Sequence, residues 1–277
     1  MPEQQIEVGI FGGSGFYELL DGAREVTVTT PYGDPSAPVV IGDIGGRSVG
    51  FLPRHGRHHE LPPHRINYRA NMWAMAQLGA TDVVLPCAAG SLQPDVAPGH
   101  FVLADQVIDR TRGRADTFYD GPDTTHVSFA EPYDAEMRQT AIATARRLGI
   151  TIHERGTIVV IQGPRFSTKA ESRWFSAMGW EVINMTQYPE VILARELQMA
   201  ALNISLITDY DVGLADDPDV EGVSHAAVIK VFAANNAKLR ELLFALVPDL
   251  PLSADRPALH ALEGAPHLIP RRRRPQV

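Results

Sequence analysis

The sequence predicts a single-domain α/β fold in which helices flank a mixed, twisted and partly barrel-like sheet. Three observations favour this class. Apolar runs typical of strands alternate along the chain with runs of helical spacing. Several short strand-like runs crowd into the first third of the sequence. Neither an internal repeat nor a clear linker interrupts the chain before about residue 249.

The expected strands are short apolar or alternating runs that end at glycine, proline or polar residues. They are residues 6–11, 24–30, 38–43, 48–53, 81–87, 100–109, 157–163, 181–185 and 202–211. The expected helices have apolar residues three and four positions apart, and they are residues 68–78, 134–148, 189–200 and 223–247. A further helix carries Lys169, Glu171 and Trp174, and we expect Ser167 or Thr168 to cap it.

Composition and charge limit the possible partners. The 277 residues include 44% hydrophobic and 21% charged residues, which is ordinary globular usage. A net charge of -8 opposes a general nucleic-acid surface but allows a local basic pocket for one small anion. The single cysteine, Cys87, favours a reducing compartment. We see no signal peptide and no run near the roughly 18 apolar residues of a membrane span, so we expect a cytoplasmic protein without membrane contact.

The end of the chain differs in composition from the rest. We expect one domain over residues 1–250 and a Pro/Arg-rich, partly disordered tail over residues 251–277. The run Arg271–Arg274 is more typical of a solvated tail than of a polyanion site.

Five polar or glycine-rich segments follow predicted strands, and ligands of open α/β sheets bind beyond the carboxyl ends of strands. These segments are Gly12–Gly15, Arg54–Gly56, a small-residue turn at Cys87–Ser91, Asn184–Thr186 and Asp209–Asp211. We expect them to converge on one cleft.

The Gly-Gly-Ser-Gly segment fails three known motifs. Glu18 breaks the dinucleotide fingerprint, no Gly-Lys-Ser/Thr follows as in a Walker loop, and Phe16 breaks the nucleophile elbow. The segment can offer backbone N–H groups and the Ser14 hydroxyl to a small anion. An ordinary turn is an equally good interpretation of this motif alone.

The segment at residues 53–60 combines two arginines with three histidines. Arg54 can bind phosphate with two N–H groups, and His55 adds a donor. The histidine spacing does not match a known zinc motif, so a metal site is disfavoured. For His58, His59 and His64 we favour surface or packing roles.

Asp209 and Asp211 lie two residues apart at a predicted strand end. On an extended segment their side chains would point the same way. Two aligned carboxylates can accept hydrogen bonds from an amino group and a protonated ring nitrogen. A metal site or a solvated acidic turn is also compatible with this pattern.

In their order along the chain, these segments resemble the family of methylthioadenosine and purine nucleoside phosphorylases. The resemblance covers about residues 6–248. It is carried by GIFGGSGF, TPYGDPSAP, LPRHGRHH, INYRANMWA, CAAGSL, DQVIDRT, TFYDG, HVSFAEPY, QGPRFSTKAES, VINMTQYPEVILARE and ITDYD. It implies a nucleoside-phosphorylase-like fold and a pentosyltransferase of purine salvage. Such an enzyme splits adenine from a 5'-modified ribose with inorganic phosphate as co-substrate and needs no metal or organic cofactor.

The resemblance also implies the site. The residues that bind phosphate in the family correspond to Ser14, Arg54, His55, Cys87, Ala88 and Thr186 of this sequence. The family's purine-binding residues correspond to Ser167, Asp209 and Asp211, and its ribose-binding residue corresponds to Met185. Members that prefer 6-oxopurines usually carry Glu and Asn in place of Ser167 and Asp209. A carboxylate accepts a hydrogen bond from a 6-amino group but opposes a 6-oxo group, so adenine is the expected base.

The resemblance implies a reaction in which the enzyme transfers a proton to the purine and positions the two reactants. Asp209 would share or donate a proton at purine N7, and Asp211 would hold the amino group. Bound phosphate would stabilise the cationic sugar and then attack C1'.

Two residues depart from the methylthioadenosine branch, which usually has Thr at position 87 and a small apolar residue at position 225. The thiol of Cys87 is a weaker donor than a hydroxyl, so a phosphate contact there can be backbone only. His225 makes a polar 5' pocket possible, with Val228 and Ile229 on its apolar side. The 5' group is therefore open among methylthio, hydroxyl, hydrogen and halogen. In the other interpretation His225 is a displaced residue on a helix face.

Family members are typically homotrimers in which a neighbour's loop closes the 5' pocket, and His126 matches that loop. Three alternatives stay open. They are a broader phosphorylase acting on adenosine, 5'-deoxyadenosine or 5'-halo-adenosines, a non-catalytic nucleotide-binding protein, and a metal-dependent hydrolase.

Overall fold

The computed structural model describes residues 5–12, 23–122, 124–212 and 225–264. For residues 225–230, 232 and 234 it describes the backbone alone. Ser14 therefore lies outside the described residues, as do the side chains of His225, Val228 and Ile229.

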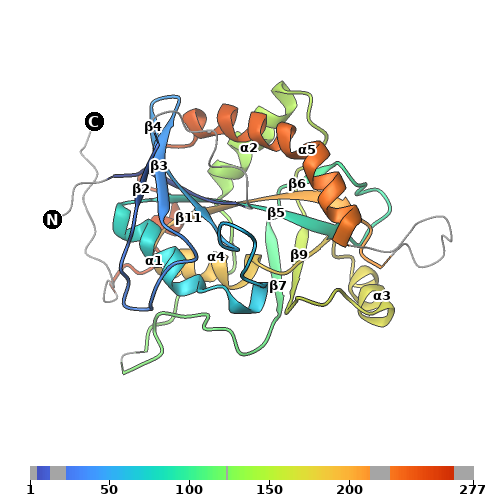
Figure 1. The fold of residues 1–277 in the computed structure, drawn as a ribbon, viewed down its shortest axis with the longest axis horizontal. Coiled ribbons are helices and arrows are strands. Elements are labelled where there is room, and N and C mark those ends of the chain that lie inside the picture. Colours follow the sequence, from blue (N-terminus) through green and yellow to red (C-terminus); the bar gives the residue numbers. More distant parts are fainter. Residues whose placement is uncertain (1–4, 13–22, 123, 213–224, 265–277) are drawn as a thin grey trace.

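Within the described residues the strands form one mixed sheet, drawn in Figure 1. The strands are β1 (Val8–Gly12), β2 (Arg24–Val26), β3 (Val39–Ile44), β4 (Arg47–Pro53), β5 (Asp82–Ser91), β6 (Phe101–Val102), β7 (Gln106–Arg110), β8 (Ile152–His153), β9 (Thr157–Ile161), β10 (Val182–Asn184) and β11 (Ala200–Asp209). The helices are α1 (Tyr68–Leu78), α2 (Ala135–Arg147), α3 (Lys169–Ala177), α4 (Gln187–Glu196) and α5 (His225–Leu246). Short 3-10 turns lie at Pro63–Arg65, Val247–Asp249 and Pro257–His260.

The central strand is β5, which pairs with three neighbours. It runs parallel to β1 on one side and to β11 on the other. Its last two residues, Gly90 and Ser91, pair antiparallel with β10. The edge of β5 opposite β11 is therefore shared: β1 pairs with its first residues and leads on to β4-β3-β2, and β10 pairs with its last residues and leads on to β9-β7. On its own side, β11 leads on to β6 and β8. The predicted single-domain fold with a mixed sheet is confirmed.

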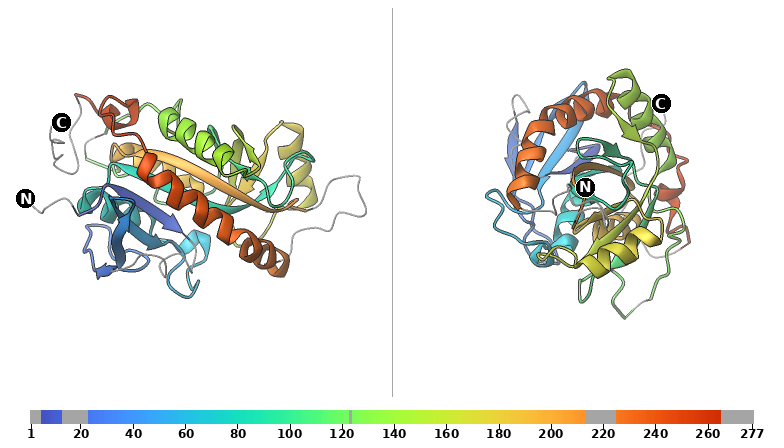
Figure 2. Two further views of the ribbon diagram at one scale, coloured as in Figure 1. Left: turned by 90° about the horizontal axis from the view of Figure 1, so that it is seen from above. Right: turned by 90° about the vertical axis from the view of Figure 1, so that its right-hand side faces the viewer.

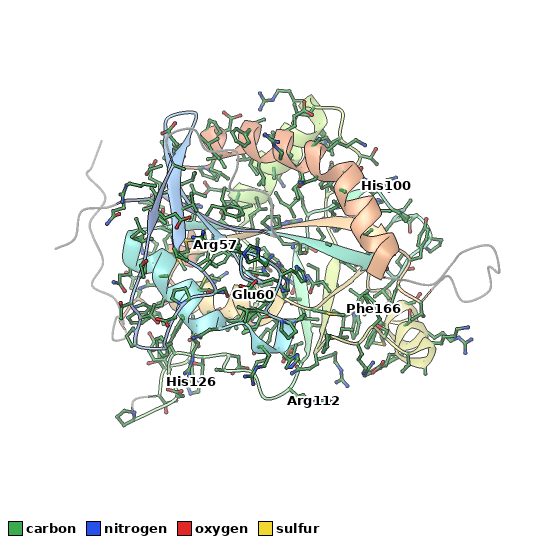
Figure 3. The ribbon with its side chains drawn as sticks, in the orientation of Figure 1. Arg57, Glu60, His100, Arg112, His126 and Phe166 are labelled. Carbon is green, nitrogen blue, oxygen red and sulfur yellow. The ribbon has the colours of Figure 1, made fainter. Side chains whose placement is uncertain are left out.

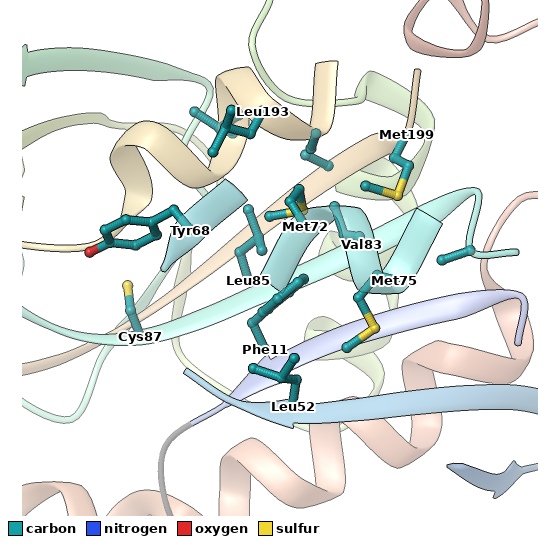
Figure 4. Close-up of a cluster of buried hydrophobic side chains, with 14 of the residues drawn as sticks. Phe11, Leu52, Tyr68, Met72, Met75, Val83, Leu85, Cys87, Leu193 and Met199 are labelled. Atoms are coloured by element: carbon teal, nitrogen blue, oxygen red, sulfur yellow. The ribbon is translucent and has the colours of Figure 1, made fainter. Parts of the chain in front are cut away.

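Helices cover the central strands on two faces, as Figure 1 and the views in Figure 2 show. On one face α1 and α4 pack through residues such as Met72, Met75 and Leu193 (Figure 4). On the other face α2 and α5 contribute Met137 and Leu242 to a second buried cluster. Because both faces are covered, β1 and nearly all of β5 and β11 are buried, as parallel strands generally are.

Local sequence fixes the helix ends. The Thr168 hydroxyl accepts from the Glu171 N–H, and the Glu171 side chain accepts from the Thr168 N–H, which is the predicted cap of α3 in the form of a capping box. Asn67 caps α1, and Gly79 ends it in the left-handed conformation. No helix within the described ranges is long and apolar enough to cross a membrane.

Three predicted segments differ from the structure. Residues Cys87–Ser91 continue β5 rather than forming a turn, because β11 pairs with β5 as far as Gly90. The predicted strand at residues 24–30 is ordered as a strand over residues 24–26. The run at 100–109 contains two short strands with different partners.

The first part of the expected tail packs onto the domain. Arg256 is fully buried and forms an ion pair with Asp82 at the start of β5, and its Nη1 lies 3.7 Å from Asp134. Leu259 and Leu262 are also buried. This segment therefore joins the amino-terminal edge of the sheet, opposite the strand ends that carry the candidate site residues. Residues 265–277 lie outside the described part of the chain.

Candidate active site

Four neighbouring parallel strands, β4, β1, β5 and β11, bring their carboxyl ends to one edge of the sheet. Arg54 follows β4, and its backbone N–H donates to the Gly12 carbonyl at the end of β1 over 3.1 Å. Asp209 ends β11. Ala88 is partly exposed, whereas its neighbours along β5 are buried, so solvent reaches the sheet at this point.

The Arg54 side chain is buried between β5 and α4. Its Nε and Nη2 donate to the two carboxylate oxygens of Glu190 over 2.6 and 2.9 Å, and its Nη1 donates to the Pro86 carbonyl over 2.9 Å. Burial raises the pKa of Glu190, and the Arg54 charge opposes that rise. The fork-to-fork geometry fixes the plane of the guanidinium. Three of its five N–H groups are used in these bonds.

His55 lies in the compact loop that follows β4. Its Nδ1 is 2.8 Å from the Leu61 carbonyl, which can only accept, so Nδ1 carries the proton when the ring is neutral. Burial and the Arg54 charge lower the pKa of His55 to about 4. The ring stacks on His59 at 4.4 Å. At neutral pH, Nε2 therefore has a lone pair that can accept a proton or a hydrogen bond.

Thr186 precedes α4, is buried and makes no capping bond with its side chain. Tyr188 has an extended backbone (φ -109°, ψ 128°), and Pro189 has no N–H group, so the regular helix starts after this kink and the Thr186 hydroxyl is the group left for a ligand. Met185 is half-buried beside Gly163, where an added Cβ would lie 2.6 Å from the Met185 sulfur. Glycine is therefore required at position 163 for this methionine to keep its place.

The Cys87 thiol is bonded within the core. Its sulfur accepts from the side-chain amides of Asn184 and Asn203 over 3.3 and 3.6 Å, and it lies 3.4 Å from the Ser205 hydroxyl. Ser205 donates its own hydrogen to Asn203, so the thiol hydrogen points to the Ser205 oxygen. Figure 4 shows Cys87 at one end of the core cluster. The backbone of β5 is the part of this residue left for a ligand.

Asp209 and Asp211 are brought together by a bulge and a tight turn, so their predicted extended alignment is wrong. The register of β11 against β5 shifts between Ile207 and Asp209. The Asp211 N–H donates to Asp209 Oδ1 over 2.8 Å, and Asp211 has a φ of 49°. An added Cβ at Gly90 would lie 3.0 Å from Asp209 Oδ1, so the small residue on β5 makes room for the carboxylate.

Burial dominates the electrostatics of this pair. It raises the pKa of Asp209 to about 6, against the hydrogen bonds from Thr208 and the Asp211 N–H. Burial also raises the pKa of Asp211, while Ser172 and Ser167 lower it. Yet Asp211 Oδ2 and Ser167 Oγ, both buried, make no hydrogen bond of normal geometry with the described residues. Buried unpaired oxygens in one place are typical of a site that a ligand completes.

His126 is exposed on the long loop between β7 and α2. Figure 3 shows it on the opposite side of the molecule from Phe166, the neighbour of Ser167. The chain therefore does not bring His126 to its own carboxylate pair. Within the described ranges, no group of three or more His, Cys, Asp or Glu side chains could hold a metal ion.

Sequence reasoning missed Glu190, Thr208 and Ser172 as parts of this site. Glu190 was detectable as a lone carboxylate in the otherwise apolar run at 189–194. Ser172 follows Glu171 on α3, but its proximity to Asp211 arises from tertiary packing that local sequence does not record.

The fold and the site together define an α/β enzyme class. A buried arginine lies beside Pro86 of β5, and a pair of carboxylates lies beside Gly90 at the end of the same strand. Comparison identifies the family: the sequence model of the phosphorylase superfamily matches residues 7–248, and the chain belongs to this superfamily.

Named relatives are similar over nearly the whole chain. A purine nucleoside phosphorylase of Streptomyces coelicolor is 49% identical over 258 residues, covering 90% of this chain and 91% of that protein. An S-methyl-5'-thioadenosine phosphorylase of Thermofilum pendens is 48% identical, covering 95% and 99%. The structure of a methylthioadenosine phosphorylase from Schistosoma mansoni in complex with adenine superposes with a TM-score of 0.83 at 38% identity, covering 87% and 91%.

Proposed function

We propose that the chain catalyses the phosphorolysis of S-methyl-5'-thioadenosine, or of a related 5'-modified adenosine, to adenine and the 5-modified ribose 1-phosphate. The observation that carries this proposal is the pair of half-buried Asp209 and buried Asp211, with unpaired oxygens on Asp211 and Ser167. A 6-aminopurine offers the donors that these acceptors lack. The similar proteins named as methylthioadenosine phosphorylases, one of them bound to adenine, support the same substrate.

The phosphate half of the site consists of Arg54, His55, Ala88, Thr186 and the Cys87 backbone, with Ser14 from outside the described residues. The two N–H groups of Arg54 that Glu190 and Pro86 do not use would bind phosphate oxygens. The Nε2 lone pair of His55 would accept a hydrogen bond from the O–H of a monohydrogen phosphate. The Thr186 hydroxyl, which makes no capping bond, would add a donor.

The base half of the site consists of Ser167, Asp209 and Asp211, with Met185 beneath the ribose between the two halves. Protonated Asp209 would donate to purine N7 as the C1'–N9 bond breaks, and the electron pair of that bond would leave with the purine. Asp211 would accept from the 6-amino group. Phosphate would then form the new bond to C1', so the reaction needs no enzyme nucleophile. We propose inorganic phosphate as co-substrate and no further cofactor.

A second candidate is a broader purine nucleoside phosphorylase that acts on adenosine, 5'-deoxyadenosine or 5'-halo-adenosines. The relative from Streptomyces coelicolor carries the broader name. Two residues would decide between the two substrate ranges: His225, and Val228 on the apolar side of the 5' pocket.

We infer a homotrimer with shared active sites, because His126 is exposed and lies far from the base half of its own chain. Exposed Phe166, Trp174 and Met178 around α3 supply apolar surface next to the base half, where a neighbour could pack. We place the enzyme in the cytoplasm because Cys87 is a free, buried thiol within the core.

The test is adenine release from methylthioadenosine, 5'-deoxyadenosine, adenosine and inosine, each with and without phosphate, and each with EDTA. We expect phosphate-dependent and EDTA-insensitive release, highest from methylthioadenosine, with inosine inactive. Higher release from adenosine would support the broader enzyme. Release without phosphate, or none from any substrate, would contradict the proposal.

The 5' specificity has its own test. His225→Val should raise the ratio of methylthioadenosine to adenosine cleavage by about tenfold, the value of one lost hydrogen bond to a hydroxyl. An unchanged ratio would remove His225 from the 5' pocket.

A further inference from the structure

The hydroxyl of Thr208 lies between two acceptors. Its Oγ1 is 2.7 Å from Asp209 Oδ2 and 3.2 Å from the Ala89 carbonyl oxygen of β5. The side chain is buried, with 3% of its surface exposed, so water does not compete for the hydroxyl. A hydroxyl has one hydrogen, and it cannot donate fully to both acceptors at once.

Thr208 holds this place because of the bulge in β11. Ile207 pairs with Ala89 and Asp209 pairs with Gly90, so Thr208 is the extra residue between two consecutive positions of β5. A bulge redirects a side chain that would otherwise alternate across the sheet. Here it places the hydroxyl within reach of the neighbouring carboxylate.

Asp209 can change its charge state near neutral pH, since burial raises its pKa to about 6. The other charged group acting on it is Asp211, and Glu171 of α3 acts in turn on Asp211. The adjoining β5 residues, Ala89 and Gly90, are uncharged. The Thr208 hydroxyl is thus the side-chain donor that meets Asp209 in its charged form.

We propose that Thr208 is a positioning residue that turns its single hydroxyl hydrogen from the Ala89 carbonyl to Asp209 Oδ2 when Asp209 loses its proton. With Asp209 neutral, Oδ2 is a weak acceptor and the hydrogen is shared with Ala89. With Asp209 charged, the bond to Oδ2 becomes charge-assisted and dominates. Neither state leaves the hydroxyl hydrogen without an acceptor.

This inference rests on the proposed function for its catalytic meaning. In phosphorolysis the proton would pass from Asp209 to purine N7, and the negative charge left on the carboxylate would strengthen the Thr208 bond. The bond is then stronger after proton transfer than before it, so it favours the transfer.

The first experiment follows Thr208 in the unmodified enzyme. With 13C-labelled threonine methyl groups, the Thr208 methyl resonance should shift with pH with the apparent pKa of Asp209, which carboxyl 13C NMR measures. In Asp209→Asn the same resonance should not respond to pH. A Thr208 resonance that stays constant while Asp209 titrates would overturn the proposal. This readout needs no turnover, so it stands apart from failure of the proposed function.

The second experiment measures catalysis in Thr208→Val, which keeps the shape and loses the hydroxyl. We expect kcat to fall about tenfold and the alkaline limb of its pH profile to move up by about one pH unit, because the carboxylate loses a donor. Thr208→Ser should restore both. The control Thr144→Val makes the same change at a buried position on α2. A wild-type pH profile in Thr208→Val, or equal losses in the Val and Ser variants, would overturn the proposal.

Discussion

The polar side chains Arg54 and His55 of the proposed phosphate half already have protein partners, whereas the proposed base half holds buried oxygens without them. Arg54 is paired with Glu190, and the His55 Nδ1 is bonded to the Leu61 carbonyl. In the base half, Asp211 Oδ2 and Ser167 Oγ are buried without a bond of normal geometry. The two regions lie along the same strand, β5, so the difference comes from their neighbours rather than from the strand.

This difference shows two ways to prepare a site. Pairing Arg54 with a carboxylate fixes the direction of its guanidinium and partly balances its charge, so this group is held rigid before any ligand binds. Unpaired buried acceptors lower the stability of the free protein until a ligand supplies hydrogen-bond donors. A ligand without donors leaves these acceptors unpaired and therefore binds more weakly. We therefore expect loss of the partner of Arg54 to act mainly on stability, and substitutions of the carboxylate pair to act mainly on catalysis.

The largest expected effect is in the base half. Asp209→Asn should lower kcat/KM for adenine nucleosides about 10³-fold, as loss of a general acid does. Because the native pKa of Asp209 is raised to about 6, the folded state binds more protons than the unfolded state between about pH 4 and 6. Wild-type stability should therefore fall relative to the variant across this window and stay lower above it. Steady-state kinetics and urea unfolding at pH 4.5 and 7.5 check both expectations.

The next effect is in the phosphate half and concerns stability. Glu190→Gln leaves the buried Arg54 charge without its counter-charge, so the free energy of unfolding should fall by about 3 kcal/mol. The matched control is Asp249→Asn, which breaks an exposed pair with Arg147 and should cost less than about 1 kcal/mol. Urea unfolding measures both. An equal loss of unfolding free energy in the two variants would contradict a larger contribution of the buried Arg54–Glu190 pair.

His55 should change the stability of the protein with pH in the opposite direction to Asp209. Its pKa is lowered to about 4 in the folded state, so the unfolded state binds more protons between about pH 4 and 6.5. Wild-type stability should drop by about 2 kcal/mol from pH 7 to pH 5 through this residue. In His55→Asn, whose amide can still donate to Leu61, that part of the drop should disappear. Melting temperatures of the wild type and the variant at the two pH values test this expectation. An equal fall in melting temperature from pH 7 to pH 5 in both proteins would contradict a neutral His55.

The smallest expected effect on activity is at Cys87. Cys87→Ala removes the acceptor of the Asn184 and Asn203 amides, so the free energy of unfolding should fall by about 1 kcal/mol. The KM for phosphate should stay within about twofold, because the thiol points into the core. A tenfold rise in that KM would show that the thiol contacts phosphate.

Sequence patterns predicted most of the fold because the elements are locally determined. The helix at Tyr68–Leu78 has its predicted bounds, since Asn67 caps it and Gly79 ends it. The small residues at Cys87–Ser91 predict a turn, and this prediction is wrong because pairing with β11 keeps the segment extended. Such pairing between distant segments leaves no local pattern.

The site was predictable in its residue types but not in its geometry. Arg54, His55 and the two carboxylates were found from polar residues at strand ends. The bulge at Thr208 and the Glu190 partner of Arg54 depend on contacts between elements far apart in sequence. For the same reason the direction of the Cys87 thiol followed only from its neighbours on other strands.

The most direct test of a divided site is calorimetry of inorganic phosphate and of adenine, each binding alone to two variants. Thr186→Val should weaken phosphate binding about tenfold and leave the adenine Kd within about twofold, because each variant loses hydrogen bonds to one ligand. Asp211→Asn should do the reverse. If either variant weakened both ligands equally, or the wrong one, the division of the site into a phosphate half and a base half would be contradicted.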